Sequence, residues 1–228
     1  MFKAKFINRG FKENLVLIPG WATDWRIFDS LDLNYNYISL IEFSPFNFVD
    51  GLLKHLEDSS IDKVSMLGWS MGAFLAADFT VKNQNKVKEL YLLSIRNKYE
   101  PELLKEIKDK LMKNKTAWLY KFYRDCFSRQ DPEGLSWFKK ILLKDYLKEY
   151  ELLKLCEGLE YLSTAELDTG SLAKVEHLKI IHGVDDLIAP FKEAQEIKDK
   201  LPNAGFVAMQ GTGHVLFLSP LLKEIFYG

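Results

Sequence analysis

The 228-residue sequence has only two cysteines, Cys126 and Cys156, and no apolar run of the roughly 20 residues that a membrane span requires. Two cysteines without metal-binding companions do not make a disulfide framework, so we expect buried thiols in a reducing cytoplasm. The sequence also has no excess of positive or negative charge, because it contains 31 basic and 32 acidic residues. No nucleic acid partner is therefore expected. The N-terminal segment has no continuous apolar core. We therefore expect neither a signal peptide nor a membrane partner.

Short apolar runs alternate with helical patterns before residue 97 and again after residue 172. The strand candidates are Phe2–Ile7, Asn14–Ile18, Tyr35–Leu40, Lys63–Leu67, Val87–Ser94, Leu178–His182 and Gly205–Met209. The helix candidates are Trp25–Leu31, Phe46–Ser59, Met71–Lys82, Phe191–Leu201 and Pro220–Tyr227. Strands that alternate with helices are joined by crossovers. This predicts the α/β fold class, with a mostly parallel sheet flanked by helices.

The alternation stops between residues 97 and 172, where the sequence is almost wholly helical, with a break at Asp131-Pro132-Glu133-Gly134. We therefore predict a core made of residues 1–96 and 173–228, with a helical lid insertion over residues 97–172. Open α/β sheets bind ligands at the carboxyl ends of their strands. The insertion is expected to cover such a site.

The strongest local motif is Gly68-Trp69-Ser70-Met71-Gly72, between a predicted strand and a predicted helix. A sharp strand-to-helix turn exposes a serine hydroxyl above the sheet, and the small residues on both sides prevent backbone collisions. The amide of Met71 would then face a developing oxyanion at the start of the helix. The alternative is a glycine-rich turn with a capping serine.

A nucleophilic serine needs a base and an orienting carboxylate. His214 follows Gly211-Thr212-Gly213 in a loop near the C-terminus, which makes it the candidate base, whereas His182 is expected to be packed or hydrogen-bonded at a strand end. Asp185 and Asp186 both follow a predicted strand and are both candidates for the acid. Along the chain, the serine, the acid and the histidine follow in the same order as in α/β-hydrolases.

These motifs resemble those of the α/β-hydrolase superfamily over nearly the whole chain. The resemblance implies an α/β-hydrolase fold and selects Asp186 as the triad acid, because Gly183-x-x-Asp186 followed by Pro190 matches the family pattern. It also implies an oxyanion hole made by the amides of Trp21 and Met71. Pro19 stands where the family commonly has a histidine.

Within the superfamily, Gly20-Trp21, the serine motif and Gly213–Pro220 are most similar to the pimeloyl-[acyl carrier protein] methyl ester esterases of biotin synthesis. The resemblance implies a carboxylesterase and an acyl carrier protein as partner. Trp21 and Trp69 would contact the substrate or pack around the pocket. Carrier proteins are acidic, and residues 113–140 hold seven basic against three acidic residues, although both signs balance at 14 over residues 97–172. The candidate docking residues are Lys121, Arg124 and Arg129.

Several rivals share the predicted triad: a general short-chain esterase, a thioesterase or a carbon–carbon bond hydrolase. A rival of another class is a non-catalytic ligand-binding protein on the same fold. The sequence has no metal-ligand cluster, phosphate-binding glycine loop or dinucleotide fingerprint, so no cofactor and no metal are expected.

Overall fold

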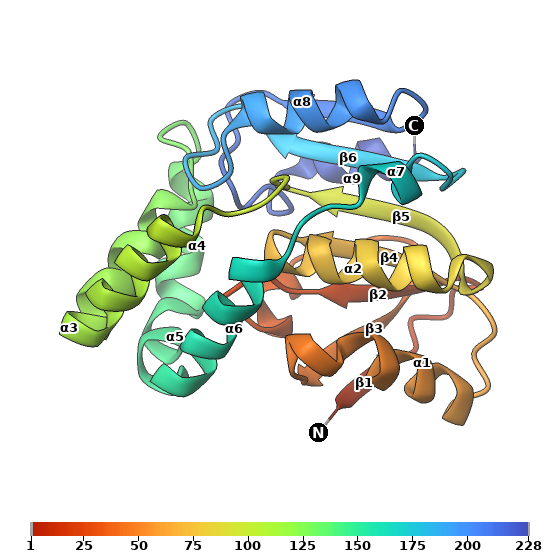
Figure 1. Ribbon diagram of the computed structural model, residues 1–228, viewed down its shortest axis with the longest axis horizontal. Helices are drawn as coiled ribbons and strands as arrows, with labels where there is room; N and C mark the ends of the chain where they lie inside the picture. Colours follow the sequence, from red (N-terminus) through yellow and green to blue (C-terminus); the bar gives the residue numbers. More distant parts are fainter. Residues whose placement is uncertain (1, 228) are drawn as a thin grey trace.

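The computed structural model describes residues 2–227, in which seven strands form one sheet of order β1-β3-β2-β4-β5-β6-β7. Only β1 runs antiparallel to its neighbour, which confirms the predicted mostly parallel sheet and the α/β fold class (Figure 1). The strands are β1 (Lys3–Ile7), β2 (Asn14–Ile18), β3 (Asn36–Glu42), β4 (Val64–Trp69), β5 (Val87–Leu93), β6 (Leu178–Gly183) and β7 (Gly205–Met209).

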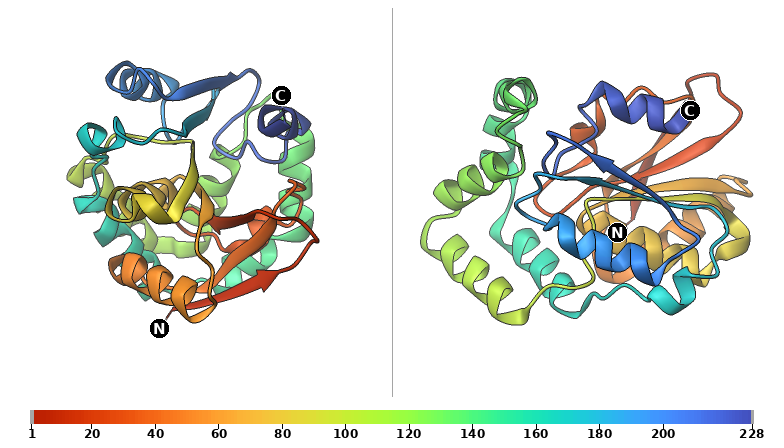
Figure 2. Two further views of the ribbon diagram at one scale, coloured as in Figure 1. Left: turned by 90° about the vertical axis from the view of Figure 1, so that its right-hand side faces the viewer. Right: turned by 90° about the horizontal axis from the view of Figure 1, so that it is seen from above.

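Helices cover both faces of the sheet, so its central strands are buried on both sides. The helices α1 (Phe48–Asp58), α2 (Met71–Lys82) and α8 (Phe191–Lys200) lie on one face, and α9 (Pro220–Tyr227) lies on the other (Figure 2). On the α9 side, Tyr91 of β5 stacks on Phe226 with ring centroids 4.2 Å apart. Because helices cover both faces of the sheet, β2 and β4 are buried nearly throughout and do not alternate between apolar and polar residues.

The segment predicted as a lid, residues 97–172, is called here the helical insertion. It contains α3 (Pro101–Asp125), α4 (Pro132–Ile141), α5 (Leu143–Glu149), α6 (Leu152–Thr164) and α7 (Thr169–Leu172). Helices α3 to α6 lie beyond the carboxyl ends of the parallel strands, at the left of Figure 1. Non-helical backbone at Asn114 kinks α3.

Two local predictions differ from the structure. The predicted helix over Trp25–Leu31 is a short 3-10 helix, Trp25–Phe28, whose first turn is capped by the Asp24 carboxylate. The predicted break at 131–134 falls partly inside α4: Asp131 accepts a hydrogen bond from the Gly134 amide at 2.9 Å, and Pro132 occupies the first helical position. Proline is well tolerated at that position because its missing N–H has no helical partner there.

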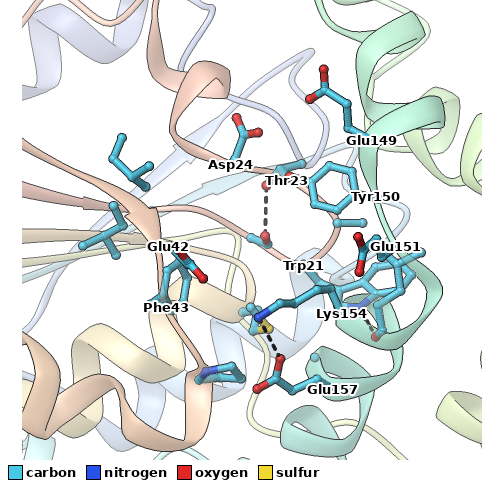
Figure 3. Close-up of a pocket in the computed structure, with 18 of the residues that line it drawn as sticks. Trp21, Thr23, Asp24, Glu42, Phe43, Glu149, Tyr150, Glu151, Lys154 and Glu157 are labelled. Atoms are coloured by element: carbon cyan, nitrogen blue, oxygen red, sulfur yellow. Dashed lines mark hydrogen bonds and ion pairs between the residues drawn. The ribbon is translucent and has the colours of Figure 1, made fainter. Parts of the chain in front are cut away.

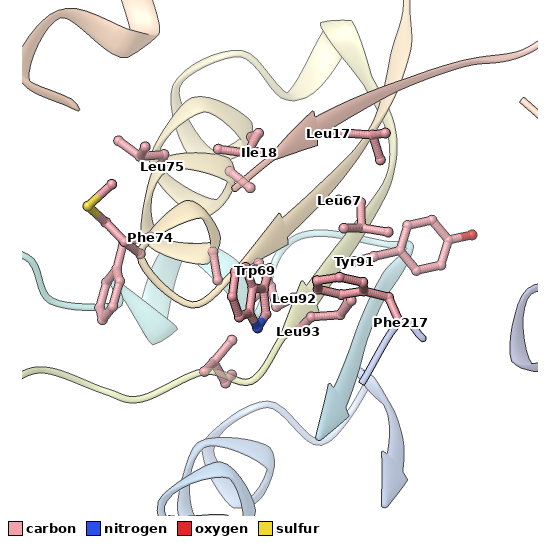
Figure 4. Close-up of a cluster of buried hydrophobic side chains, with 14 of the residues drawn as sticks. Leu17, Ile18, Leu67, Trp69, Phe74, Leu75, Tyr91, Leu92, Leu93 and Phe217 are labelled. Atoms are coloured by element: carbon pink, nitrogen blue, oxygen red, sulfur yellow. The ribbon is translucent and has the colours of Figure 1, made fainter. Parts of the chain in front are cut away.

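Large buried side chains pack beneath the carboxyl end of β4 (Figure 4). Trp69 is 1% exposed and packs edge-on against Phe217, with ring centroids 5.2 Å apart. Leu17, Leu67 and Leu92 of adjacent strands belong to the same cluster. The residue that follows Trp69 therefore stands on a close-packed platform. In the described chain, no helix is both long and apolar enough to cross a bilayer.

Candidate active site

Ser70 lies in the turn between β4 and α2 with φ 57° and ψ −118°, a strained conformation for a residue with a side chain. Its amide donates to the carbonyl of Leu93 at 2.9 Å, which ties the turn to β5. The flanking glycines are required by contact: a Cβ on Gly68 would lie 2.3 Å from the Gly72 carbonyl oxygen. This is the strand-to-helix turn expected from the motif.

The structure brings together the three side chains of the predicted triad. His214 Nε2 lies 2.8 Å from Ser70 Oγ, and His214 Nδ1 lies 2.7 Å from Asp186 Oδ2. All three residues are at most 7% exposed. With the proton on Nδ1 donated to the carboxylate, Nε2 is left to accept the Ser70 proton. The arrangement suits transfer of that proton to the imidazole.

The orientation of Asp186 is fixed by backbone donors. Its Oδ1 accepts hydrogen bonds from the amides of Ile188 and Ala189, both at 2.8 Å. Burial by itself raises the pKa of this carboxyl, but the charge and hydrogen bond of His214 outweigh burial and hold the pKa below its usual value. Asp186 is therefore an ionised partner for an imidazolium.

Asp185, the neighbouring candidate, is engaged elsewhere. Its carboxylate accepts a hydrogen bond at 2.7 Å from Ser128 Oγ, which lies in the loop between α3 and α4 of the helical insertion. His182 is packed as expected, because its Nε2 lies 2.8 Å from the Ala189 carbonyl oxygen and its ring is fully buried. It also lies 3.5 Å from Asp186 Oδ2, and burial lowers its pKa below the usual value.

The loop after β2 lies against Ser70. A Cβ on Gly20 would lie 3.1 Å from Ser70 Cβ, so the backbone that carries Trp21 passes directly beside the serine. Thr23 Oγ1 donates to the Gly20 carbonyl at 2.9 Å and holds the loop. Met71 is the first residue of α2. The two residues predicted to supply oxyanion donors therefore flank Ser70 from separate elements.

A cavity of about 520 Å³ lies above Ser70, between the core and the helical insertion. Trp118 and Phe122 of α3 stack with ring centroids 5.6 Å apart, and both pack edge-on against Trp21. Charged side chains also line the cavity. The lining residues are Trp21, Ser70, Arg96, Tyr99, Leu103, Leu104, Glu106, Ile107, Lys110, Trp118, Lys121, Phe122, Asp125, Leu159, Leu162, Leu187 and Ile188.

The two tryptophans of the sequence prediction have different places. Trp21 lines the cavity, and its Nε1 donates to the Leu155 carbonyl of α6 at 2.9 Å. Trp69 is not among the lining residues, and its Nε1 donates to the His214 carbonyl at 2.8 Å. Of the two alternatives for Trp69, contact with substrate and packing, the structure corresponds to packing. Its side chain lies on the core side of the turn, beneath the histidine loop.

A second cavity of about 410 Å³ is also lined by Trp21, together with Met71 (Figure 3). Carboxylates dominate its charged walls: Arg26 and Lys154 face Asp24, Glu42, Glu149, Glu151 and Glu157. Some of these charges are paired, since Arg26 contacts Asp24 at 2.7 Å and Glu149 at 2.6 Å. The two cavities thus have different chemistry, the one above Ser70 being more apolar.

The basic residues predicted to dock a carrier protein lie near the C-terminal end of α3. Lys121 and Arg124 both form ion pairs with Asp125, and Lys121 lines the cavity above Ser70. Arg129 is exposed in the following loop. Within residues 2–227 there is no cluster of three or more histidine, cysteine or acidic side chains suited to a metal ion.

Sequence reasoning missed the segment that follows β5. Ser94, Arg96 and Tyr99 all contact the site, and Arg96 and Tyr99 line its cavity. A signal was available, because β5 is parallel to β4 and both strands end at the same sheet edge. Residues just beyond β5 must therefore lie close to Ser70.

Comparison with known proteins agrees with the fold and with the motifs. Residues 39–220 match the family model described as alpha/beta hydrolase fold, and the chain belongs to this family. It is similar to the pimeloyl-[acyl-carrier protein] methyl ester esterase of Nitrosomonas europaea, with 24% identity over 229 residues and 90% of each chain covered. The esterase of the same name from Yersinia pseudotuberculosis is 25% identical, with 90% of this chain and 88% of that protein covered.

Solved structures show the same architecture. An esterase from Exiguobacterium antarcticum superimposes with a TM-score of 0.81 at 17% identity, covering 99% of this chain and 92% of that one. A bromoperoxidase from Bacillus anthracis gives a TM-score of 0.84 at 18% identity, covering 99% and 94%. At such identities these likenesses establish the fold, and the predicted α/β-hydrolase resemblance is confirmed.

Proposed function

We propose that the protein is a serine carboxylesterase that works through an acyl-enzyme. The observation that carries the proposal is the buried relay from Ser70 Oγ through His214 to Asp186, with links of 2.8 Å and 2.7 Å. A serine hydroxyl is a weak nucleophile at neutral pH and becomes reactive when a base removes its proton. The relay supplies that base together with the carboxylate that stabilises its cation.

In the first half-reaction, Ser70 Oγ attacks the ester carbonyl carbon while His214 Nε2 takes the serine proton. The carbonyl oxygen becomes an oxyanion, which the amides of Trp21 and Met71 bind in this mechanism. Collapse of the intermediate breaks the bond to the alcohol oxygen, and His214 returns its proton to the leaving alcohol. Water deprotonated by His214 then attacks the acyl-enzyme, which releases the acid and regenerates Ser70.

For the substrate, we propose pimeloyl-[acyl carrier protein] methyl ester, in biotin synthesis in the cytoplasm. Two observations support this choice: the names of the relatives, and the apolar side chains of Trp118, Phe122 and Leu162 in the wall of the cavity above Ser70. An apolar wall suits the methylene chain of an acyl group. Lys121, Arg124 and Arg129 would meet the acidic carrier protein, although Asp125 already neutralises part of this charge.

The test is hydrolysis of pimeloyl-[acyl carrier protein] methyl ester beside free methyl esters of graded chain length. We expect turnover of the carrier-bound ester with the highest kcat/KM, and loss of turnover in Ser70→Ala without loss of fold. A fluorophosphonate should label the wild type and spare Ser70→Ala. Equal labelling of both proteins would remove Ser70 as nucleophile, whereas indifference to the carrier would reduce the assignment to a general esterase.

A further inference from the structure

A left-handed backbone at residues with a side chain is rare in this protein and gathers at the candidate active site. Among residues 2–227, four non-glycine residues have positive φ: Ala22, Ser60, Ser70 and Ser94. Ser60 lies in an exposed turn after α1, whereas Ala22 directly follows Trp21. Backbone of this kind is strained and persists only where the surrounding structure maintains it. Ser94, with φ 51°, directly follows β5 and has no role in the mechanism proposed above.

The Ser94 side chain is bonded to the backbone of the proposed base. Its Oγ donates a hydrogen bond to the His214 carbonyl at 2.7 Å, and both residues are at most 1% exposed. Trp69 Nε1 donates to the same carbonyl at 2.8 Å. A carbonyl oxygen accepts hydrogen bonds roughly along its two lone-pair directions, so two donors fix the direction of the C=O bond. The peptide group that follows the His214 imidazole is therefore held from two sides.

The end of β5 holds the backbone of Ser70 and of His214 through two consecutive residues. The Leu93 carbonyl accepts from the Ser70 amide at 2.9 Å, and the Ser94 hydroxyl donates to His214. The loop that carries His214 contains Gly211, with φ 69°, and Gly213, and glycine leaves the backbone many conformations. Contacts from outside the loop must therefore select the one that places the imidazole beside Ser70 Oγ.

The chain beyond Ser94 also contacts the loop of the acid. The Arg96 guanidinium forms two hydrogen bonds with the Glu193 carboxylate, at 2.7 Å and 2.9 Å, and donates to the Ile188 carbonyl at 3.4 Å. The Ile188 amide is in turn one of the two donors to Asp186 Oδ1. The segment directly after β5 thus contacts the loops of both partners of Ser70.

We propose that Ser94 is a positioning residue of the active site: its hydroxyl, in the left-handed bend after β5, fixes the backbone of His214 relative to Ser70. The inference rests on the proposed esterase function and assigns a further residue to that site. Ser94 is not among the described residues that line the cavity above Ser70, so it acts through His214 and not on the substrate. Loss of its hydroxyl should slow proton transfer and leave substrate binding unchanged.

The test is a pair of variants, Ser94→Ala and Ser94→Gly. Both remove the hydroxyl, but only glycine also removes the backbone strain. Loss of one net hydrogen bond corresponds to about a 2- to 10-fold lower kcat for a p-nitrophenyl acyl ester, and we expect the same decrease in both variants. KM should stay within twofold. Fluorophosphonate labelling of Ser70 should slow by the same factor as kcat, because both reactions need the proton transfer to His214.

Ser60→Ala and Ser60→Gly are the matched controls. Ser60 has φ 54°, and it lies before the amino end of β4, whereas Ser70 follows the carboxyl end. The same chemical and backbone changes are thus made away from the site, and kcat should stay at the wild-type value. Urea unfolding midpoints for all four variants show how much fold is retained.

Proton NMR gives a readout that does not depend on turnover. The proton of a short hydrogen bond between an imidazole and a carboxylate resonates far downfield, and its resonance moves upfield as the bond lengthens. The resonance of the His214 Nδ1 proton, which faces Asp186 Oδ2 at 2.7 Å, should move upfield in both Ser94 variants. It should stay in place in both Ser60 variants. A purely structural role of Ser94 would leave it unchanged.

Wild-type kcat and labelling rate in both Ser94 variants would overturn the inference, as would an unchanged NMR resonance or a KM that rises while kcat is unchanged. Recovery of kcat in Ser94→Gly alone would also overturn it, because backbone strain and not the hydroxyl would then set the rate. An equal loss in Ser60→Ala would do the same. If the wild type is neither labelled by fluorophosphonate nor able to hydrolyse any acyl ester, the esterase proposal itself fails, and the NMR resonance still tests whether Ser94 positions His214.

Discussion

Replacing Gly72 with alanine tests how closely the turn that carries Ser70 must approach the loop after β2. Gly72 is the second residue of α2, and a Cβ there would lie 2.2 Å from the Ile18 carbonyl oxygen and 2.7 Å from that of Pro19. Both atoms belong to backbone, and Ile18 is bound in the sheet between β3 and β4. No side chain can rotate to make room. The start of α2 and the β2 loop must move apart.

Two magnitudes follow from that movement. Overpacking a dense core costs about 1–3 kcal/mol of unfolding free energy, which exceeds the roughly 0.5–1 kcal/mol that alanine gains over glycine in a helix. The movement also separates Trp21 from Ser70 and Met71, and in the proposed mechanism the loss of one oxyanion donor would lower kcat about 10²- to 10³-fold. We therefore expect the kcat of Gly72→Ala to fall much further than its loss of unfolding free energy can explain. Urea denaturation and ester hydrolysis on the same preparation measure both.

Gly170→Ala is the matched control. Gly170 lies in α7, and a Cβ there would meet only Asp168 Oδ1 at 3.4 Å, an ordinary contact. This variant should be at least as stable as the wild type and equally active. If Gly72→Ala retained wild-type stability and kcat, the close approach of the two backbones at Ser70 would be wrong, and with it the placement of the Trp21 loop beside Ser70.

Three other predictions concern the acid, the cavity and the helical insertion. The pKa of folded Asp186 is held below the usual 3.8, so its ionised carboxylate stabilises the fold above pH 4 and this stabilisation is lost as the pH falls. Urea denaturation of the wild type and Asp186→Asn should therefore show that the advantage of the wild type in unfolding free energy is smaller at pH 3 than at pH 7. Trp118→Ala removes a wall of the cavity, so hydrolysis of p-nitrophenyl esters of graded length should move its optimum to longer or bulkier acyl chains, and an unchanged optimum would contradict this role. Ser128→Ala deletes the donor to Asp185 and should cost about 0.5–1.5 kcal/mol in a urea titration.

Local sequence signals predicted the core of the fold well. The bounds of α2, β7 and α9 agree with the predicted ranges, since each has a turn or a change of hydrophobic period at its ends. The Ser70 turn was predictable for the same reason: Gly68 and Gly72 are needed for contacts with near neighbours, and they leave a mark in the sequence itself. Asp131 shows where local signals fail. A capping residue directly before a proline is compatible both with a break between helices and with the start of a helix.

The choice between Asp185 and Asp186 shows where local reasoning ends. Both carboxylates follow β6, and nothing in their immediate neighbours separates them. The structure separates them through distant partners: Ser128 lies 57 residues before Asp185, and His214 lies 28 residues after Asp186. Family resemblance selected Asp186 where residue chemistry alone could not. No motif of the sequence analysis included Tyr99. It lines the same cavity as Ser70 only because of the way the chain turns after β5.

The backbone of His214 connects the relay to the helical insertion. Its carbonyl accepts from Trp69 Nε1 at 2.8 Å and from Ser94 Oγ at 2.7 Å, so the residue before Ser70 and the residue after β5 hold the same atom. The next amide, that of Val215, donates to the Cys126 carbonyl at the end of α3 at 3.0 Å. Since α3 also carries walls of the cavity above Ser70, a shift of this helix would change both the space in that cavity and the orientation of the imidazole. Substitutions at the end of α3, for example at Cys126, should therefore alter kcat as well as the preference for acyl-chain length. This effect would be indirect, because Cys126 forms no hydrogen bond with Ser70 or with the carboxylate of Asp186.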